Sequence, residues 1–446
     1  MKKEYLRPVL VILFFLLIFS PLFVMPFVEP GLSRGWQREF SVILGFVGLT
    51  MAGWQLAPIS RFTPAQKLFN LDRLYRFHHL LSLLSALFVT VHYLLLLLNF
   101  EAGIGINSWA LALLNIFTAP LRAKMGVISI LAYVLITITS VFRKQLRLDY
   151  DVWRILHDIF TLLLVGGGLT HALLVGRYTA APAMKALLWF ETALWVLAAL
   201  YIRVIKPLQQ LRRPYKIVEV REEVENVFSL ILEPQGFDLP DFHPGQVAWL
   251  TVRRSPFSLR RHPFSISSSV YNRKQFTFTI KELGDFTKTV RDLKKGETVY
   301  VDGPFGYYDV TSPENKGIVL IAGGIGIAPA MSVLRSMSDG KDPREVLLFY
   351  GHKYIEHVVF DEELKKLEES SLNFKYFVVL EQPPADWQGY KGFITQDILK
   401  KELPSDYQSL SYFVCGPLPM MSAIRKILTQ LGVPAENTHY EEFNMA

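Results

Sequence analysis

Six long apolar stretches dominate the first half of the chain. They span residues 8–28, 40–60, 77–100, 125–142, 159–176 and 186–202. Each is close to the roughly 20 residues that a membrane-spanning helix needs, so the pattern predicts six transmembrane helices. We expect the first stretch to be retained, because no small-residue cleavage site ends it. Glu191 interrupts the sixth stretch and either moves protons or pairs with a neighbouring helix.

The distribution of positive charge predicts the orientation of these helices. Counted at alternate ends of the six stretches, Lys and Arg number fifteen on one side and six on the other. By the positive-inside rule the N-terminus and everything after Arg213 are cytoplasmic. We therefore expect an integral protein of the plasma or inner membrane. The basic residues serve orientation and contact with anionic lipids, so the net charge of +7 predicts no nucleic-acid partner.

The chain has one cysteine, Cys415. One thiol cannot form an internal disulfide, hold an iron–sulfur cluster alone or build a cysteine-based zinc site. Any bound metal must therefore be held by histidine or carboxylate.

Histidines recur at a fixed spacing in the third and fifth stretches. His78 and His92 are 14 residues apart, and so are His157 and His171. Fourteen residues fall only about 40° short of whole helical turns and rise roughly 21 Å. Both helices run in the same direction, so His78 is level with His157 and His92 with His171. Two imidazoles at each level are what a haem with two axial nitrogens requires.

Other interpretations of the histidines remain open. His79 competes with His78 for the inner level, although it points about 140° away from His92. The histidines could instead hydrogen-bond neighbouring helices or form a proton relay in a transporter. The glycine run 166–168 suits close approach of a flat macrocycle or simple helix packing.

The second half of the chain has a different pattern of hydrophobic and polar residues. Short alternating segments from 215 to 303 predict a small antiparallel β-barrel. From about Lys316, strands alternate with helical stretches, which predicts a parallel α/β layer. We therefore expect a multi-domain membrane protein with a helical transmembrane domain at 1–210, a barrel domain at 211–312 and an α/β domain at 313–446.

Two motifs in the barrel are candidates for binding a planar aromatic cofactor with a pyrophosphate. "HPFS" offers an aromatic and proline-bounded wall with a hydroxyl, and "GDFT" offers backbone N–H groups and a hydroxyl for the pyrophosphate. The candidate residues are His262, Pro263, Phe264, Ser265, Ile280, Lys281, Gly284 and Thr287.

The α/β region carries a glycine-rich turn, "AGGIGIAP", between a hydrophobic strand and a helix opened by Pro329. Its glycines let a diphosphate approach the helix N-terminus. The candidate residues here are Gly323, Gly324, Gly326, Ile327 and Pro329. A later strand ends in Cys415, Gly416 and Pro417, where a nicotinamide could lie.

The strand "EVLLFYGHK" ends in His352 and Lys353 rather than in the Asp or Glu that hydrogen-bonds a ribose 2′-hydroxyl. Basic residues there favour a 2′-phosphate, so we expect NADPH, with NADH possible. An ordinary basic strand end is the alternative.

The chain resembles the NADPH oxidase and ferric reductase transmembrane family. The resemblance is carried by the two pairs of histidines at 14-residue spacing together with "HPFS", "GDFT", "AGGIGIAP", "CGP" and the C-terminal "EEF". The resemblance implies a six-helix haem domain fused to a module similar to ferredoxin–NADP reductase, with FAD and two b-type haems. It also implies that His262 replaces the arginine of soluble relatives and that Phe443 stacks on the flavin. The chain shows no EF-hand loop, and we expect no obligatory protein partner.

The expected function is electron transfer from cytosolic NADPH through FAD and the haems to an acceptor outside. Oxygen, giving superoxide, and ferric chelates are the candidate acceptors. A transporter with a histidine proton relay and a redox-sensing cytoplasmic domain is a rival from another class. A membrane-anchored flavin reductase that serves a cytoplasmic acceptor is a third interpretation.

Overall fold

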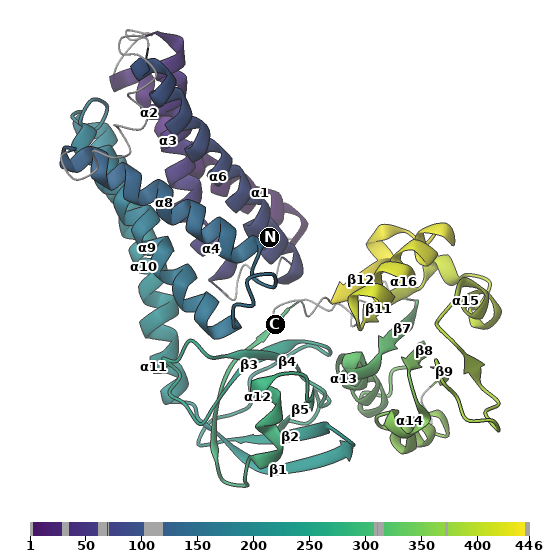
Figure 1. Ribbon diagram of the computed structural model, residues 1–446. Coiled ribbons are helices and arrows are strands. Elements are labelled where there is room, and N and C mark those ends of the chain that lie inside the picture. Colours follow the sequence, from purple (N-terminus) through teal and green to yellow (C-terminus); the bar gives the residue numbers. More distant parts are fainter. Residues whose placement is uncertain are drawn as a thin grey trace. The chain divides into compact units, whose positions relative to one another are not determined.

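The computed structural model divides into two compact units, Met1–Lys206 and Pro207–Ala446. The first is helical, and the second contains an antiparallel and a parallel β-sheet with flanking helices (Figure 1). The structure describes residues 3–28, 35–60, 69, 71–101, 119–306, 310, 316–370 and 373–441.

Five helices in the described ranges are long and apolar enough to cross a membrane, or six if a bent pair counts as one span. The bent pair, α1 and α2, turns by 40°, so the first predicted span is two helices rather than one. The helices are α1 (Lys3–Ile18), α2 (Ser20–Val28), α3 (Trp36–Trp54), α4 (Leu56–Ile59), α6 (Leu71–Glu101), α8 (Leu121–Val141), α9 (Tyr150–Val175), α10 (Pro182–Leu200) and α11 (Lys206–Leu211). A π-helical turn, Tyr201–Ile205, joins the last two.

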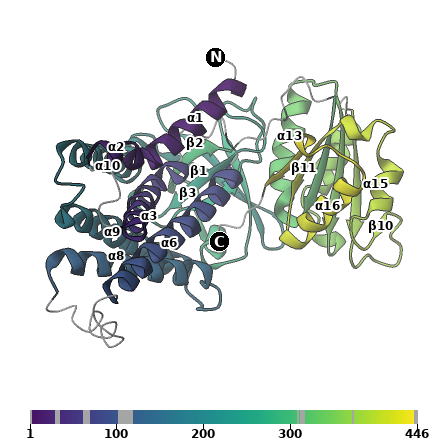
Figure 2. The same cartoon turned by 90° about the horizontal axis from the view of Figure 1, so that it is seen from above.

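Two helix pairs form the body of the first unit, because α3 packs along α6 and α8 packs along α9 (Figure 2). Small residues allow the close approach: a Cβ atom on Gly48 or Gly167 would meet the neighbouring helix at 2.7 or 3.0 Å. A serine hydroxyl crosses each pair. Ser85 donates to the Gly48 carbonyl at 2.7 Å, and Ser129 donates to the Leu164 carbonyl at 2.8 Å.

The antiparallel sheet of the second unit has the strand order β4-β3-β6-β1-β2-β5. Its strands are β1 (Tyr215–Val224), β2 (Val227–Pro234), β3 (Val247–Val252), β4 (His262–Ser265), β5 (Phe276–Lys281) and β6 (Thr298–Phe305). Alternate side chains of β2, β3 and β5 fill its core, where Leu230, Leu250 and Phe278 are fully buried. An isolated bridge between Ile266 and Phe278 brings the two edge strands together.

The parallel sheet has the order β10-β9-β8-β7-β11-β12. Its strands are β7 (Gly317–Gly323), β8 (Glu345–His352), β9 (Phe374–Leu380), β10 (Tyr390–Lys391), β11 (Ser411–Cys415) and β12 (Thr438–Glu441). Its helices are α13 (Ile327–Asp339), α14 (Asp361–Glu368), α15 (Gln396–Glu402) and α16 (Leu418–Gln430). The first two cover one face and the last two the other. Figure 2 shows α13 on one side of the strands and α15 and α16 on the other. This is an α/β layer, as the sequence predicts.

The start of α13 differs from the prediction. A 3-10 turn, Gly324–Gly326, follows β7, and the α-helix begins at Ile327. Pro329 is therefore the third residue of the helix and does not open it. It is tolerated there because the first backbone N–H groups of a helix have no intrahelical partner.

Helix α13 also ties the two sheets of this unit together. Ser332 donates to the Ser268 carbonyl at 2.8 Å, and Arg335 donates to the Ser267 carbonyl at 2.6 Å. The segment after "HPFS" is thus fixed to the helix that follows the glycine-rich turn.

Candidate functional site

Helices α6 and α9 carry two facing pairs of histidines, His78 with His157 and His92 with His171. The ring centroids of His78 and His157 are 6.5 Å apart, and those of His92 and His171 are also 6.5 Å apart. His79 is exposed, so the structure pairs His78 rather than His79 with His157. This is the arrangement that the 14-residue spacing predicts, although the ligand role of these residues stays a prediction.

Neighbouring helices hold the pair of His92 and His171. Nδ1 of His92 lies 2.7 Å from the Ser41 carbonyl on α3, and Nδ1 of His171 lies 2.7 Å from the Arg122 carbonyl on α8. The Ser41 hydroxyl also donates to the His92 carbonyl at 2.9 Å. A hydrogen bond at Nδ1 fixes the ring and leaves Nε2 for a ligand, as is usual for metal-binding histidines.

Glycines lie against the same two rings. A Cβ atom at Gly45 or at Gly126 would come within 2.9 Å of His92 or His171, respectively. Each glycine stands four residues after the residue whose carbonyl binds the ring. The same arrangement, a backbone carbonyl and a glycine four residues later against one histidine ring, therefore occurs in both helix pairs, α3–α6 and α8–α9. This repeated arrangement was not predicted from the sequence, although the four-residue spacing of the two glycines from Ser41 and Arg122 could have indicated it.

The pair of His78 and His157 is held differently. Nδ1 of His78 and of His157 is buried and makes no hydrogen bond within the described residues. The indole of Trp153 lies 5.3 Å from the His157 ring, centroid to centroid. In the described ranges no three His, Cys, Asp or Glu residues lie close enough to hold a metal ion by themselves. Each histidine pair could thus bind a metal only if another molecule supplied the remaining ligands.

The two motifs of the antiparallel sheet meet at a residue that the sequence analysis did not select. Phe286 of "GDFT" stacks on His262 at 4.0 Å with an interplanar angle of 18°, and it also stacks on Phe264 at 5.8 Å. Sequence order alone could not show this contact, because it joins two separate turns of the chain.

The turn "GDFT" is closed by its own hydrogen bonds, and its role in binding a pyrophosphate stays a prediction. The Thr287 hydroxyl accepts from the Gly284 N–H at 2.8 Å and donates to the Gly284 carbonyl at 2.9 Å. These groups are therefore occupied within their own turn. Ile280 is fully buried in the sheet core.

The glycine-rich turn lies at the switch point of the parallel sheet, where the strand order reverses between β7 and β11. Ligands of such sheets bind beyond the carboxyl ends of the strands at this point. The turns pack closely there: a Cβ atom on Gly326 would lie 2.1 Å from the Cys415 carbonyl oxygen, and one on Gly416 would lie 3.1 Å from Gly323. The structure thus brings the two predicted nucleotide motifs together. Cys415 itself is a buried free cysteine.

The basic strand end carries less charge than its sequence suggests. Burial, with Lys281 and His357 nearby, lowers the pKa of His352 to about 4. This imidazole is therefore neutral near pH 7, and Lys353 is the cation of the pair. The Lys353 Nζ lies 5.0 Å from the centre of the Tyr354 ring.

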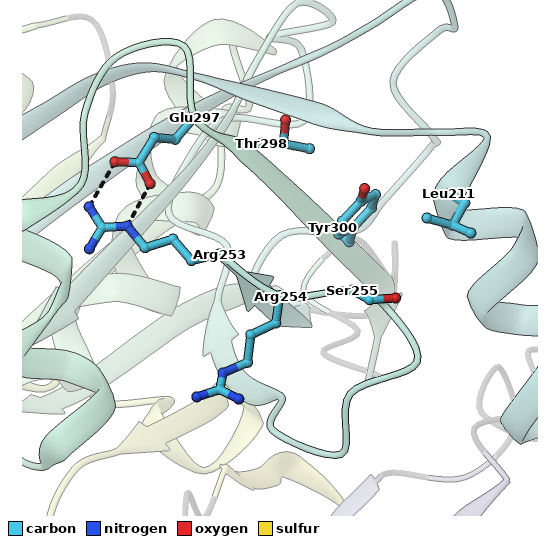
Figure 3. A pocket seen from close by; sticks show the side chains of 7 residues that line it. All are labelled: Leu211, Arg253, Arg254, Ser255, Glu297, Thr298 and Tyr300. Atoms are coloured by element: carbon cyan, nitrogen blue, oxygen red, sulfur yellow. Dashed lines mark hydrogen bonds and ion pairs between the residues drawn. The ribbon is translucent and has the colours of Figure 1, made fainter.

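A hollow of about 380 Å³ lies elsewhere on the second unit (Figure 3). Arg253 and Glu297 pair across it through two contacts of 2.7 and 2.8 Å. The lining residues are Leu211, Arg253, Arg254, Ser255, Glu297, Thr298 and Tyr300. None of the predicted cofactor-binding residues is among them.

A buried ion pair was also not predicted from the sequence. Arg261, which precedes "HPFS", pairs with Asp302 of β6 at 3.6 Å, and both side chains are 7% exposed. The pair fixes the loop that leads into the motif. Phe443 lies outside the described residues, so its predicted stacking on a flavin stays a prediction.

Three families match consecutive parts of the chain. Residues 44–168 match the ferric reductase like transmembrane component, residues 212–309 match an FAD-binding domain, and residues 320–426 match the oxidoreductase NAD-binding domain. These matches cover the regions that hold the histidine pairs, "HPFS" and the glycine-rich turn.

Curated relatives resemble the second half of the chain. NADH-cytochrome b5 reductase 1 of Kluyveromyces lactis is 33% identical over 172 residues, which are 38% of this chain and 61% of that protein. The protein of the same name from Debaryomyces hansenii is 35% identical over 34% of this chain and 54% of that protein. The chain thus spans little more than half the length of these relatives.

One solved structure is similar in fold over most of the chain. It is a flavohemoglobin from Malassezia yamatoensis with bound FAD and heme, 17% identical, with a TM-score of 0.50. The similarity covers 92% of this chain and 98% of that one.

Proposed function

We propose that this chain, an oxidoreductase with the domain architecture of the NADPH oxidase and ferric reductase family, transfers electrons from NAD(P)H across a membrane. The observation that carries the proposal is the pair of facing histidine levels in the helical unit. The same chain contains the FAD-binding and NAD-binding domains.

The histidine geometry fits two b-type haems. A metal–imidazole bond is about 2 Å long, so imidazoles on opposite sides of one metal ion have ring centres roughly 6 Å apart. We assign His78 and His157 to an inner haem and His92 and His171 to an outer haem. FAD would divide the two electrons of a hydride into single electrons, which haems can carry. With one histidine held on each side, the outer haem would offer no open position for direct binding of oxygen.

The second unit would hold the FAD and the nicotinamide nucleotide. His262 and Phe264, buttressed by Phe286, would form the wall for the flavin ring. We propose that the antiparallel sheet is a closed barrel, which the bridge between its edge strands supports. The nucleotide diphosphate would lie at 323–326 and the nicotinamide at 415–417. We keep the boundaries 1–210, 211–312 and 313–446 as proposed domains.

The membrane orientation and the acceptor complete the proposal. The excess of Lys and Arg at one set of helix ends supports cytoplasmic placement of the N-terminus and of the flavin and nucleotide domains. Oxygen, giving superoxide, is the proposed acceptor, and a ferric chelate is the alternative on the same electron path. No protein partner is required by this scheme.

The difference spectrum of the detergent-purified protein, reduced with dithionite minus oxidised, tests the proposal. We expect a b-type spectrum, about two haems per chain and bound FAD. A protein without haem would refute the assignment and favour the transporter with a histidine proton relay. A haem-containing protein whose residues 214–446 alone reproduced the full physiological activity would favour a membrane-anchored flavin reductase.

The acceptor can be tested separately with the chain in sealed vesicles. Reduction of cytochrome c that is sensitive to superoxide dismutase would support oxygen. Iron reduction that persists without oxygen and is insensitive to dismutase would support a ferric chelate.

Alanine at Gly45 or Gly126 is expected to disturb the outer haem. The added methyl group would lie 2.9 Å from a histidine ring that a backbone carbonyl holds in place. Overpacking of this kind costs about 1–3 kcal/mol, so we expect a shifted or diminished outer-haem component in the redox titration. Gly166→Ala is the matched control, because a Cβ atom at Gly166 meets nothing within 4 Å. Equal effects of all three substitutions would contradict the packing argument.

The coenzyme preference depends on Lys353 rather than His352 in this proposal. The pKa of His352 is lowered to about 4, so the ring binds a proton only well below neutral pH. We therefore expect the ratio of kcat/KM for NADPH over NADH to stay flat between about pH 7 and pH 8, where the 2′-phosphate is also fully ionised. Lys353→Gln should lower kcat/KM for NADPH by roughly tenfold and leave NADH unaffected.

A ratio that rose steeply as the pH fell toward 6 would assign the phosphate contact to a protonated His352 instead. The curated relatives are named as NADH enzymes. If the wild type used NADH and NADPH equally well, neither His352 nor Lys353 would select the coenzyme.

A further inference from the structure

A buried carboxyl group lies within the last membrane span. Glu191 of α10 is 0% exposed, and Ser20 donates a hydrogen bond to its Oε1 at 2.5 Å. Its Oε2 is buried and makes no hydrogen bond among the described residues. An ionisable group at membrane depth is costly and usually has a function. The histidine levels do not explain this one.

Two interrupted helices meet at this carboxyl group. Ser20 is the first residue of α2, at the bend between α1 and α2. Trp54, whose indole faces the Glu191 carboxyl, is the last residue of α3, and Gln55 separates α3 from α4. Irregular backbone at membrane depth is tolerated where it is buried in protein or lines a polar site.

The indoles of the cluster supply hydrogen-bond donors. Nε1 of Trp54 and Nε1 of Trp195 are both buried and make no hydrogen bond in the described part of the chain. Trp195 stands one turn after Glu191, and its ring lies on Gly53, where a Cβ atom would be 2.3 Å away. Two donors and one carboxyl oxygen are the polar complement that a bound water molecule needs.

Polar groups lie between this cluster and the level of His78 and His157. Next to Trp54, the side chain of Gln55 accepts a hydrogen bond from the Ser82 hydroxyl. That hydroxyl also lies 2.7 Å from the His78 carbonyl oxygen, and Tyr133 donates to the Ser82 carbonyl at 3.1 Å. The backbone of Gln55 lies beside the His78 imidazole. Apolar side chains alone would not connect the two places in this way.

We propose that Glu191 is a proton-binding site coupled to the inner histidine level, so that an electron arriving there favours uptake of one proton by the Glu191 carboxylate. The inference rests on the proposed function. The proton comes from solution and forms the neutral carboxylic acid, and the electron comes from NAD(P)H. The proton partly cancels the charge that the electron brings into the membrane interior. Because coupling between two sites is reciprocal, the proton in turn makes reduction of the inner haem easier.

Other charges on the helices packed against Glu191 lie farther away. Along α10 the next titratable residue is Lys185, roughly 9 Å away by helical rise. Arg7 on α1 is roughly 20 Å from Ser20 along its helix, and Glu39 on α3 is roughly 22 Å from Trp54. Tyr5 and Arg38, at the far ends of α1 and α3, are more distant still. The sequences of α2 and α4 contain no titratable residue.

Redox titrations of the detergent-purified full chain at several pH values test the proposal. We expect the midpoint potential of one haem to fall with rising pH in the wild type and to be independent of pH in Glu191→Gln. A tenfold coupling corresponds to a difference of about 59 mV between the acid and alkaline limits. The glutamine variant keeps an oxygen acceptor for Ser20. Glu39→Gln, at a second buried glutamate of the membrane unit, is the matched control and should keep the wild-type pH dependence.

Two further measurements keep the test independent of one variant. Infrared difference spectra between the oxidised and reduced protein should contain a carboxylic acid band that Glu191→Gln lacks and Glu39→Gln retains. Ser20→Ala should move the pH range of the change without abolishing it. An unchanged pH dependence in Glu191→Gln overturns this inference alone, whereas a wild-type protein without haem overturns the proposed function as well.

Discussion

Replacement of His92 by alanine is expected to lower the haem content from about two per chain to about one. The proposed outer haem would lose one of the two histidines that we assign to it, because His92 is the residue that faces His171 across the helix pair. Electrons would still reach the inner level, but NAD(P)H-dependent reduction of an acceptor outside should be almost abolished. Haem-to-protein ratios and acceptor reduction by the chain in sealed vesicles measure the two effects.

His79→Ala is the control for this result. His79 is exposed and adjacent to His78, the proposed inner ligand, so the variant should keep both haems. Reduction of a soluble artificial acceptor by the flavin should be normal in both variants. If His79→Ala lost a haem and His78→Ala kept both, the inner ligand would be His79, and the pairing of His78 with His157 would be incidental.

The second large effect is expected at the nucleotide site. A Cβ atom on Gly326 would lie 2.1 Å from the Cys415 carbonyl oxygen and 2.6 Å from the Cys415 carbonyl carbon, and neither backbone atom can rotate away. Gly326→Ala should therefore push apart the two turns at the switch point. A misplacement of about 1 Å can cost roughly a hundredfold in rate, so we expect a loss of that order in flavin reduction by NAD(P)H.

Stopped-flow reduction of the bound FAD measures this loss directly. Dithionite should still reduce both haems of the variant, which separates a nucleotide defect from a damaged membrane unit. Gly351→Ala is the matched control, since its Cβ atom would meet ordinary contacts at 3.5 Å or more. A normal rate in Gly326→Ala would show that the nucleotide does not depend on the close approach of these two turns.

Much of the site was predictable because its signals are periodic or local. The spans follow from runs of apolar residues, and the pairing of His78 with His157 follows from one spacing that two helices share. Strand β8 ends at His352, one residue before the end of the strand predicted from the sequence. The glycine-rich turn and the Cys415 turn were also found as separate motifs.

The sequence analysis failed where contacts join distant segments. The stacking of Phe286 on His262 and the link from Ser20 to Glu191 each depend on two elements meeting in space. The internal use of Gly284 and Thr287 depends on how one short turn closes. The low pKa of His352 comes mainly from burial, which no local pattern reveals.

By itself, the sequence determined the number of apolar spans to within one broken helix, the two histidine levels and the α/β character of the nucleotide domain. These properties follow from hydrophobic periodicity and helical geometry, which act along the chain. Only the tertiary structure decided which nitrogen of His92 stays available, why Gly45 and Gly126 must be small, and which residue pairs with Glu191. Those properties depend on hydrogen bonds and close contacts between separate helices, and such contacts exist only after the chain has folded.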